Sequence, residues 1–112
     1  MGLDDPDDAA AVLARLRAQV AGGQIRVTQH AQQEMFAEAF TLDDVMAAIG
    51  SGQLVEDYPD HRRGSCCLLN GETAAGRSVH VVCTTGHPIV IIITVYEPLP
   101  PAWVTPTQRR SR

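Results

Sequence analysis

Two histidines in the sequence have neighbours suited to acid–base chemistry. His30 and Glu34 are four residues apart in a predicted helix, so both lie on one helix face, where they can hydrogen-bond. His80 lies in the stretch SVHVVCTT between Val79 and Val81, and this alternation predicts a strand. Positioned imidazoles and carboxylates are the groups that most often move protons in enzymes. Each site also has a structural explanation: a surface ion pair for the first and a half-buried, hydrogen-bonded histidine for the second.

The position of His80 depends on how its strand pairs. The apolar run IVIIITVYEP predicts another strand, and the short turn GHP between the two favours an antiparallel pair. In that register His80 stands on the same side of the sheet as Thr94 and Tyr96, although a slip of one residue would undo this. A metal site made of His30, Glu34 and His80 is an alternative, because two imidazoles and a carboxylate suit several metals. Nothing in the sequence brings His80 to the helix pair, and we expect neither a metal nor a cofactor.

Charge and composition limit the partners and the location of the protein. Its 112 residues carry 13 acidic and 9 basic side chains, and the net charge is −4. Four of the acids lie within residues 4–8, so the charges from residue 9 onward balance, and arginines cluster at 62–63 and at 109–112. Such clusters either grip phosphate or form a solvated surface. The acidic start is unlike a signal peptide, and no apolar run is long enough to span a bilayer. We therefore expect a cytoplasmic protein without membrane contact.

Helical patterns dominate the first half of the chain. An acidic N-terminal helix is expected within residues 1–23, ended by two glycines, and lying as an appendage on the domain. After a short extended piece, Thr28 is a candidate N-cap for a helix covering about 29–39. Thr41 and Asp44 have the spacing of a capping box for a third helix, which Gly52 ends.

Strand patterns follow Gly52. The segments QLVEDY, SCCLLN, RSVHVVCTT and IVIIITVYEP alternate or are β-branched, and glycines between the second and third mark a hairpin loop. Helices followed by strands predict an α+β domain over 24–98, with an antiparallel sheet of about four strands packed on the helices. The segment 99–112 is rich in proline and arginine and is expected to cross the surface with Trp103 as its anchor.

Several segments resemble a bacterial family known as domain of unknown function 4258. The matching pieces, from about residue 26 to 109, are VTQHAQQEM, LVEDYPDHRRGSCCLLNG, GRSVHVVC, IIITVYEP and the tail with Trp103. Many members have an arginine after the HA pair and an arginine with glycine closing the helix, where this chain has Glu34 and AEAF. The order of helices and strands is also similar to RelE-like toxins of toxin-antitoxin systems, which cut mRNA without a metal.

This resemblance implies a toxin-like endoribonuclease domain, with RNA or the ribosome and a small zinc-finger antitoxin as partners. His80 would be the first choice for base or acid, with His30 as its partner and Glu34 orienting His30. Arg77 or Arg63 would be the phosphate clamp, Tyr96 would donate a hydrogen bond, and Tyr58 would stack on a base. The alternative is a non-catalytic protein-binding module of the same fold. An open cleft holding both His30 and His80 would favour catalysis, whereas a dry, fully packed His80 would favour the module.

Overall fold

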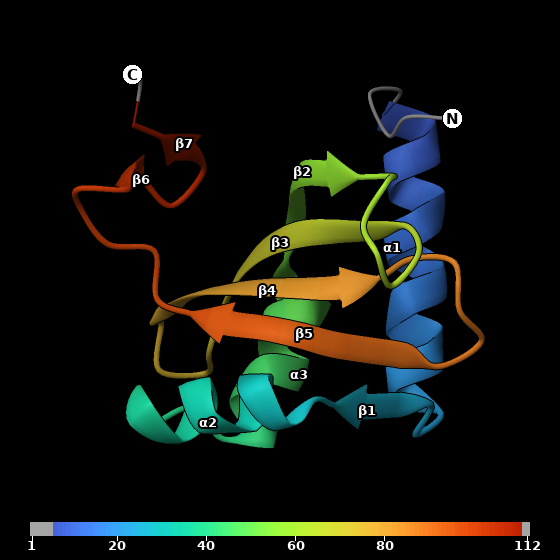
Figure 1. The fold of residues 1–112 in the computed structure, drawn as a ribbon, viewed down its shortest axis with the longest axis horizontal. Helices are drawn as coiled ribbons and strands as arrows, with labels where there is room; N and C mark the ends of the chain where they lie inside the picture. Colours follow the sequence, from blue (N-terminus) through green and yellow to red (C-terminus); the bar gives the residue numbers. More distant parts are fainter. Residues whose placement is uncertain (1–5, 111–112) are drawn as a thin grey trace.

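The computed structural model describes residues 6–110 (Figure 1). The helices in this range are α1 (Pro6–Ala21), α2 (Gln29–Ala37) and α3 (Leu42–Ser51). The strands are β1 (Ile25–Val27), β2 (Gln53–Tyr58), β3 (Cys66–Glu72), β4 (Ser78–Thr84), β5 (Val90–Tyr96), β6 (Trp103–Thr105) and β7 (Gln108–Arg109). Residues 1–5, with part of the acidic cluster, and Arg112 lie outside the described residues.

Local side-chain contacts start the second and third helices where the sequence predicts. The Thr28 side chain accepts a hydrogen bond from the Ala31 N–H at 3.1 Å, so Thr28 is the N-cap of α2. At α3, Asp44 N–H donates to Thr41 Oγ1 at 3.1 Å, and Thr41 N–H donates to Asp44 Oδ2 at 2.9 Å. This capping box satisfies amides that have no partner inside the helix. Gly52 is the C-cap of α3, and all three of these predictions are confirmed.

The main sheet differs from the predicted antiparallel sheet of about four strands. It has five strands in the order β1-β5-β4-β3-β2, and β1 pairs parallel with β5 through Ile25–Val27 and residues 90–92. The other neighbours are antiparallel. The expected short extended piece is therefore an edge strand, and the sheet is mixed. The α+β class holds, with the helices of the described chain preceding the antiparallel part of the sheet.

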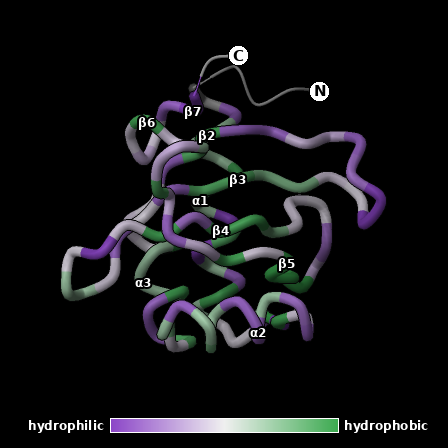
Figure 2. Tube along the Cα trace, turned by 60° about the vertical axis from the view of Figure 1, so that its left-hand side comes forward, coloured by the Kyte–Doolittle hydropathy of each residue, from purple (hydrophilic) through white to green (hydrophobic). Residues whose placement is uncertain are grey.

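The helices cover one face of the sheet, where the core lies. Helix α3 packs on β3 and β4, α2 packs on β5, and α1 packs on α3 (Figure 1). Leu16 of α1 is fully buried in the same core, so α1 is part of the domain and not an appendage. Gly71 lets α3 approach β3 closely, because a Cβ at this position would lie 1.9 Å from the carbonyl oxygen of Ala48. In Figure 2 hydrophobic residues are concentrated along β3, β4 and β5.

The opposite face of the sheet carries the polar residues of β2, β4 and β5. Part of it is covered by the segment after residue 98, in which β6 and β7 form a small two-stranded sheet. Trp103 is only 3% exposed, so it anchors this segment as predicted. The three cysteines are free and buried. No helix among residues 6–110 has the length and apolar character needed to cross a membrane.

Candidate functional site

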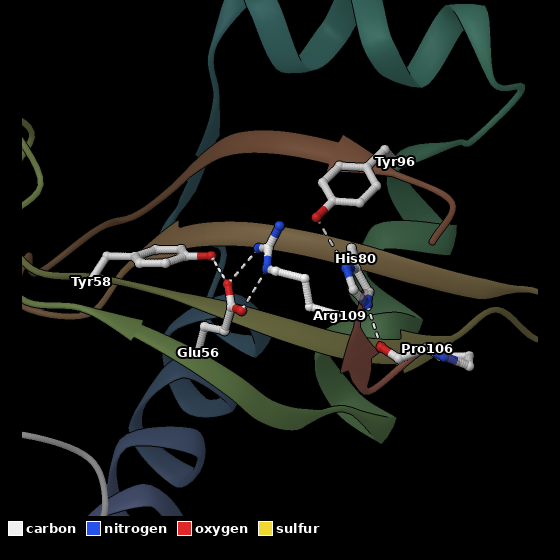
Figure 3. A network of polar contacts seen from close by, with 6 residues as sticks. All are labelled: Glu56, Tyr58, His80, Tyr96, Pro106 and Arg109. Atoms are coloured by element: carbon white, nitrogen blue, oxygen red, sulfur yellow. Dashed lines mark hydrogen bonds and ion pairs between the residues drawn. The ribbon is translucent and has the colours of Figure 1, made fainter. Parts of the chain in front are cut away.

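His80 belongs to a network of polar contacts on the outer face of the sheet (Figure 3). It is directly opposite Tyr96 in the β4–β5 register, which confirms that the two share a face. Its Nδ1 lies 3.1 Å from the Tyr96 hydroxyl, and its Nε2 lies 2.6 Å from the carbonyl oxygen of Pro106. Because a carbonyl only accepts, Nε2 carries the proton and Nδ1 accepts from Tyr96. His80 is 0% exposed.

The segment after residue 98 closes this network. The Trp103 ring packs edge-on against the His80 ring at 4.4 Å between centroids, and the Arg109 guanidinium lies over Trp103 at 4.5 Å. Arg109 also pairs with both carboxylate oxygens of Glu56, at 2.7 and 3.0 Å. The Tyr58 hydroxyl donates to the same carboxylate. Arginine and carboxylate therefore tie the C-terminal segment to strand β2.

Burial sets the protonation states in this network. Desolvation lowers the pKa of His80, although the hydrogen bond to Pro106 opposes the shift. The hydrogen bond from Arg109 lowers the pKa of Glu56, and burial raises the pKa values of Tyr58 and Tyr96. His80 is thus a neutral imidazole with both nitrogens occupied. In this conformation a substrate cannot reach the ring, and this favours a structural role for His80.

Two other predicted residues are also engaged in the fold. Tyr58 binds Glu56 through its hydroxyl and is half-buried. Arg77, proposed as a phosphate clamp, pairs with Glu97 at 3.0 Å and stacks over the Phe40 ring at 3.9 Å. A guanidinium that pairs with a carboxylate and stacks on an aromatic ring stabilises the packing of the segments that carry these groups. It would have to leave both partners to bind a phosphate.

A separate open cleft of about 390 Å³ lies near the N-terminal end of α2. One wall comes from the start of α2 and from β5, and the other comes from the β2–β3 loop, which is hydrophilic in Figure 2. The lining residues are Thr28, His30, His61, Arg62, Arg63, Ile93 and Thr94. The structure therefore brings together the predicted residues His30 and Arg63, and it leaves His80 and Arg77 outside the cleft.

Glu34 lies beside His30 at this cleft. Its Oε1 lies 3.3 Å from His30 Nε2 and also accepts a hydrogen bond from the Val95 N–H at 2.9 Å. The hydrogen bond from the β5 backbone therefore holds this carboxylate beside His30. Because Nε2 faces a carboxylate oxygen, which only accepts, the neutral tautomer that fits this contact has its proton on Nε2 and a lone pair on Nδ1. The His30 side chain is 66% exposed, so a substrate can reach it.

The β2–β3 loop supplies the basic residues of the opposite wall. His61 Nδ1 accepts a hydrogen bond from the Arg63 N–H at 3.1 Å, and His87 Nε2 donates to the Arg63 carbonyl oxygen at 2.9 Å. The side chains of Arg62 and Arg63 are exposed, and two adjacent guanidiniums favour an anionic ligand. No group of three metal-ligating side chains forms anywhere in residues 6–110, so His30, Glu34 and His80 do not meet as a metal site.

Sequence reasoning gave no role to His61, although it lies in the stretch DHRRG beside the arginine pair. This cluster of a histidine, two arginines and a glycine before a strand is the feature of the sequence that could have pointed to His61. The sequence does not reveal that this loop lines the same cleft as His30, because the two segments are 31 residues apart.

A scan against protein families matches residues 27–97 to the model described as Domain of unknown function (DUF4258). This match covers more than half of the chain. No curated protein and no solved structure matches the chain. No matching protein therefore supports the expected likeness to RelE-like toxins. All seven residues that line the cleft lie inside the matched range, whereas Trp103, Pro106 and Arg109 lie beyond it.

Proposed function

The chain belongs to the family described as Domain of unknown function (DUF4258), and we propose that it is a toxin-like endoribonuclease domain that cleaves RNA in the cleft of His30. One observation carries this proposal. An open cleft holds an imidazole fixed by a carboxylate on one side, and a second imidazole with two guanidiniums on the other. These are the groups that RNA cleavage requires: a base for the ribose 2′-hydroxyl and cations for the phosphate.

The reaction assigns a role to each wall of the cleft. His30 Nδ1 takes the proton of a ribose 2′-hydroxyl, and the 2′-oxygen attacks the adjacent phosphorus. Glu34 stabilises the imidazolium that forms, because its oxygen lies against Nε2. Arg62 and Arg63 hold the phosphate oxygens, on which charge builds up. The bond to the 5′-oxygen breaks, and this oxygen takes a proton from solvent. The products are a 2′,3′-cyclic phosphate and a free 5′-hydroxyl, and His30 returns its proton to solvent.

Purified protein tests this assignment directly. The wild type is expected to cleave single-stranded RNA in the presence of a chelator and to leave a fully 2′-deoxy strand intact. His30→Ala should lower the rate at least a hundredfold, because it removes the base. Arg63→Ala should weaken RNA binding, whereas Arg26→Ala removes an exposed arginine on β1, outside the cleft, and serves as the charge-matched control. Equal rates for the wild type and His30→Ala, or loss of cleavage with the chelator, would refute the proposal.

A second candidate is the non-catalytic protein-binding module, which the complete burial of His80 favours. In this alternative the histidines are structural hydrogen-bonding residues, and the domain binds a partner protein. Induced expression in a bacterial host separates the two candidates. Growth arrest by the wild type that His30→Ala abolishes supports the endoribonuclease and would justify mapping RNA ends on and off the ribosome. Equal, harmless growth with the wild type and His30→Ala, both folded and equally abundant, supports the module.

A further inference from the structure

The proposed reaction uses His30 and the arginines and leaves the second imidazole of the cleft without a role. His61 is on the β2–β3 loop, and it lines the same cleft as His30 from the opposite wall. We propose that His61 is a fixed hydrogen-bond donor that binds a phosphate oxygen of RNA through its Nε2–H. This inference rests on the proposed function, because it places an RNA phosphate in the cleft.

The protonation of His61 follows from its own contacts. Its Nδ1 accepts the Arg63 N–H at 3.1 Å, so Nδ1 is unprotonated and the neutral ring carries its proton on Nε2. In this tautomer Nε2 carries an N–H and can only donate. A neutral donor of this kind binds an anionic oxygen without giving up its proton.

The loop that carries His61 is braced at several points. Gly64 N–H donates to the His61 carbonyl oxygen at 2.9 Å, and Gly64 has φ +92°, a conformation that favours glycine. His87 holds the carbonyl of Arg63 from the β4–β5 turn, and the Thr85 N–H donates to the Ser65 carbonyl at 2.9 Å. The donor is thus positioned before the ligand arrives, which lowers the entropic cost of binding.

Arg62 lies between His61 and Arg63, so three consecutive residues present donors to one cleft. Two guanidiniums supply charge, and the imidazole supplies a single donor of defined direction. A tetrahedral phosphate has several oxygens to accept from such a set. The arrangement fits the phosphodiester of an RNA backbone, and it assigns His61 to binding and orientation of the phosphate rather than to proton transfer.

Substitution by glutamine separates these two roles. The glutamine amide can donate from about the position of Nε2 but cannot exchange a proton near neutral pH. Binding is measured by fluorescence anisotropy with a labelled 2′-O-methyl RNA oligonucleotide, which the proposed reaction cannot cleave. His61→Ala should weaken binding about tenfold or more, as expected when a hydrogen bond to a charged group is lost. His61→Gln should bind within about threefold of the wild type, with both variants shown to be folded by circular dichroism.

Binding and cleavage measurements together test this inference separately from the proposed cleavage. Equal binding by the wild type and His61→Ala would overturn the inference, and so would His61→Gln binding as weakly as His61→Ala. If binding depends on His61 but cleavable RNA stays intact, the cleavage proposal fails and the inference stands. If the wild type cleaves RNA and His61→Ala neither binds more weakly nor cleaves more slowly, the inference alone fails. A wild type that does not bind the oligonucleotide overturns both.

Discussion

His80→Ala should destabilise the protein strongly while leaving the cleft intact. The imidazole is fully buried between Tyr96 and Trp103, and both of its nitrogens are hydrogen-bonded. Replacing a buried ring of this size by alanine leaves a cavity and removes two hydrogen bonds, which together cost roughly 3 kcal/mol. For a domain of this length, that loss lowers the melting temperature by about 10–15 °C.

Urea unfolding followed by fluorescence measures this loss, because Trp103 is the sole tryptophan and lies against His80. The midpoint should fall without a change in the slope of the transition. A loss below about 1 kcal/mol would refute the packing described for His80. RNA cleavage is then measured below the transition, where the variant is folded. Loss of cleavage by folded His80→Ala, with His30→Ala still active, would refute the division of roles between the network and the cleft.

Three further predictions concern the fold. Burial lowers the pKa of His80 below the ordinary value of about 6.5, so the unfolded chain takes up the proton first. The stability that neutral His80 contributes to the folded state is complete above pH 6.5 and is lost as the pH falls toward the folded-state pKa. Urea midpoints at pH 7.5 and 5.5 should therefore differ more for the wild type than for His80→Gln. Gly71→Ala should cost about 2–4 kcal/mol or prevent folding, since its Cβ would strike the α3 backbone, whereas Gly50→Ala, with no atom within 4 Å of the added Cβ, should be neutral or stabilising in thermal unfolding. Arg109→Ala should cost about 0.5–1 kcal/mol, less at high salt, because its pair with Glu56 is half-exposed; no change in the urea midpoint at low salt would contradict the pairing.

The features that the sequence predicts well are the local ones. Thr28, Thr41 and Asp44 cap their helices through contacts that span three residues, so a short stretch of sequence determines them. The face shared by His80 and Tyr96 also follows from local alternation and a short turn. Such features need only the chain geometry of one or two adjacent elements.

The features that the sequence does not predict depend on distant segments. Strand β1 joins the sheet by pairing with residues 65 positions later, and no local pattern distinguishes such an edge strand from an extended linker. The cover over His80 comes from Pro106, 26 residues away, and the partner of Arg77 is 20 residues away. His61 lines the same cleft as His30 only because the fold brings the β2–β3 loop and the start of α2 to one place.

The cleft of His30 and the network of His80 therefore depend on different segments of the chain. The cleft is built wholly from the segment that matches the family, so a chain ending near residue 98 would retain His30, Glu34 and the loop with His61. The network of His80 is closed by Trp103, Pro106 and Arg109, all from the following segment. Without that segment His80 would lose its acceptor at Nε2 and face solvent on the sheet. The burial of His80 in this chain thus depends on the C-terminal segment and does not follow from the strand pattern around the histidine.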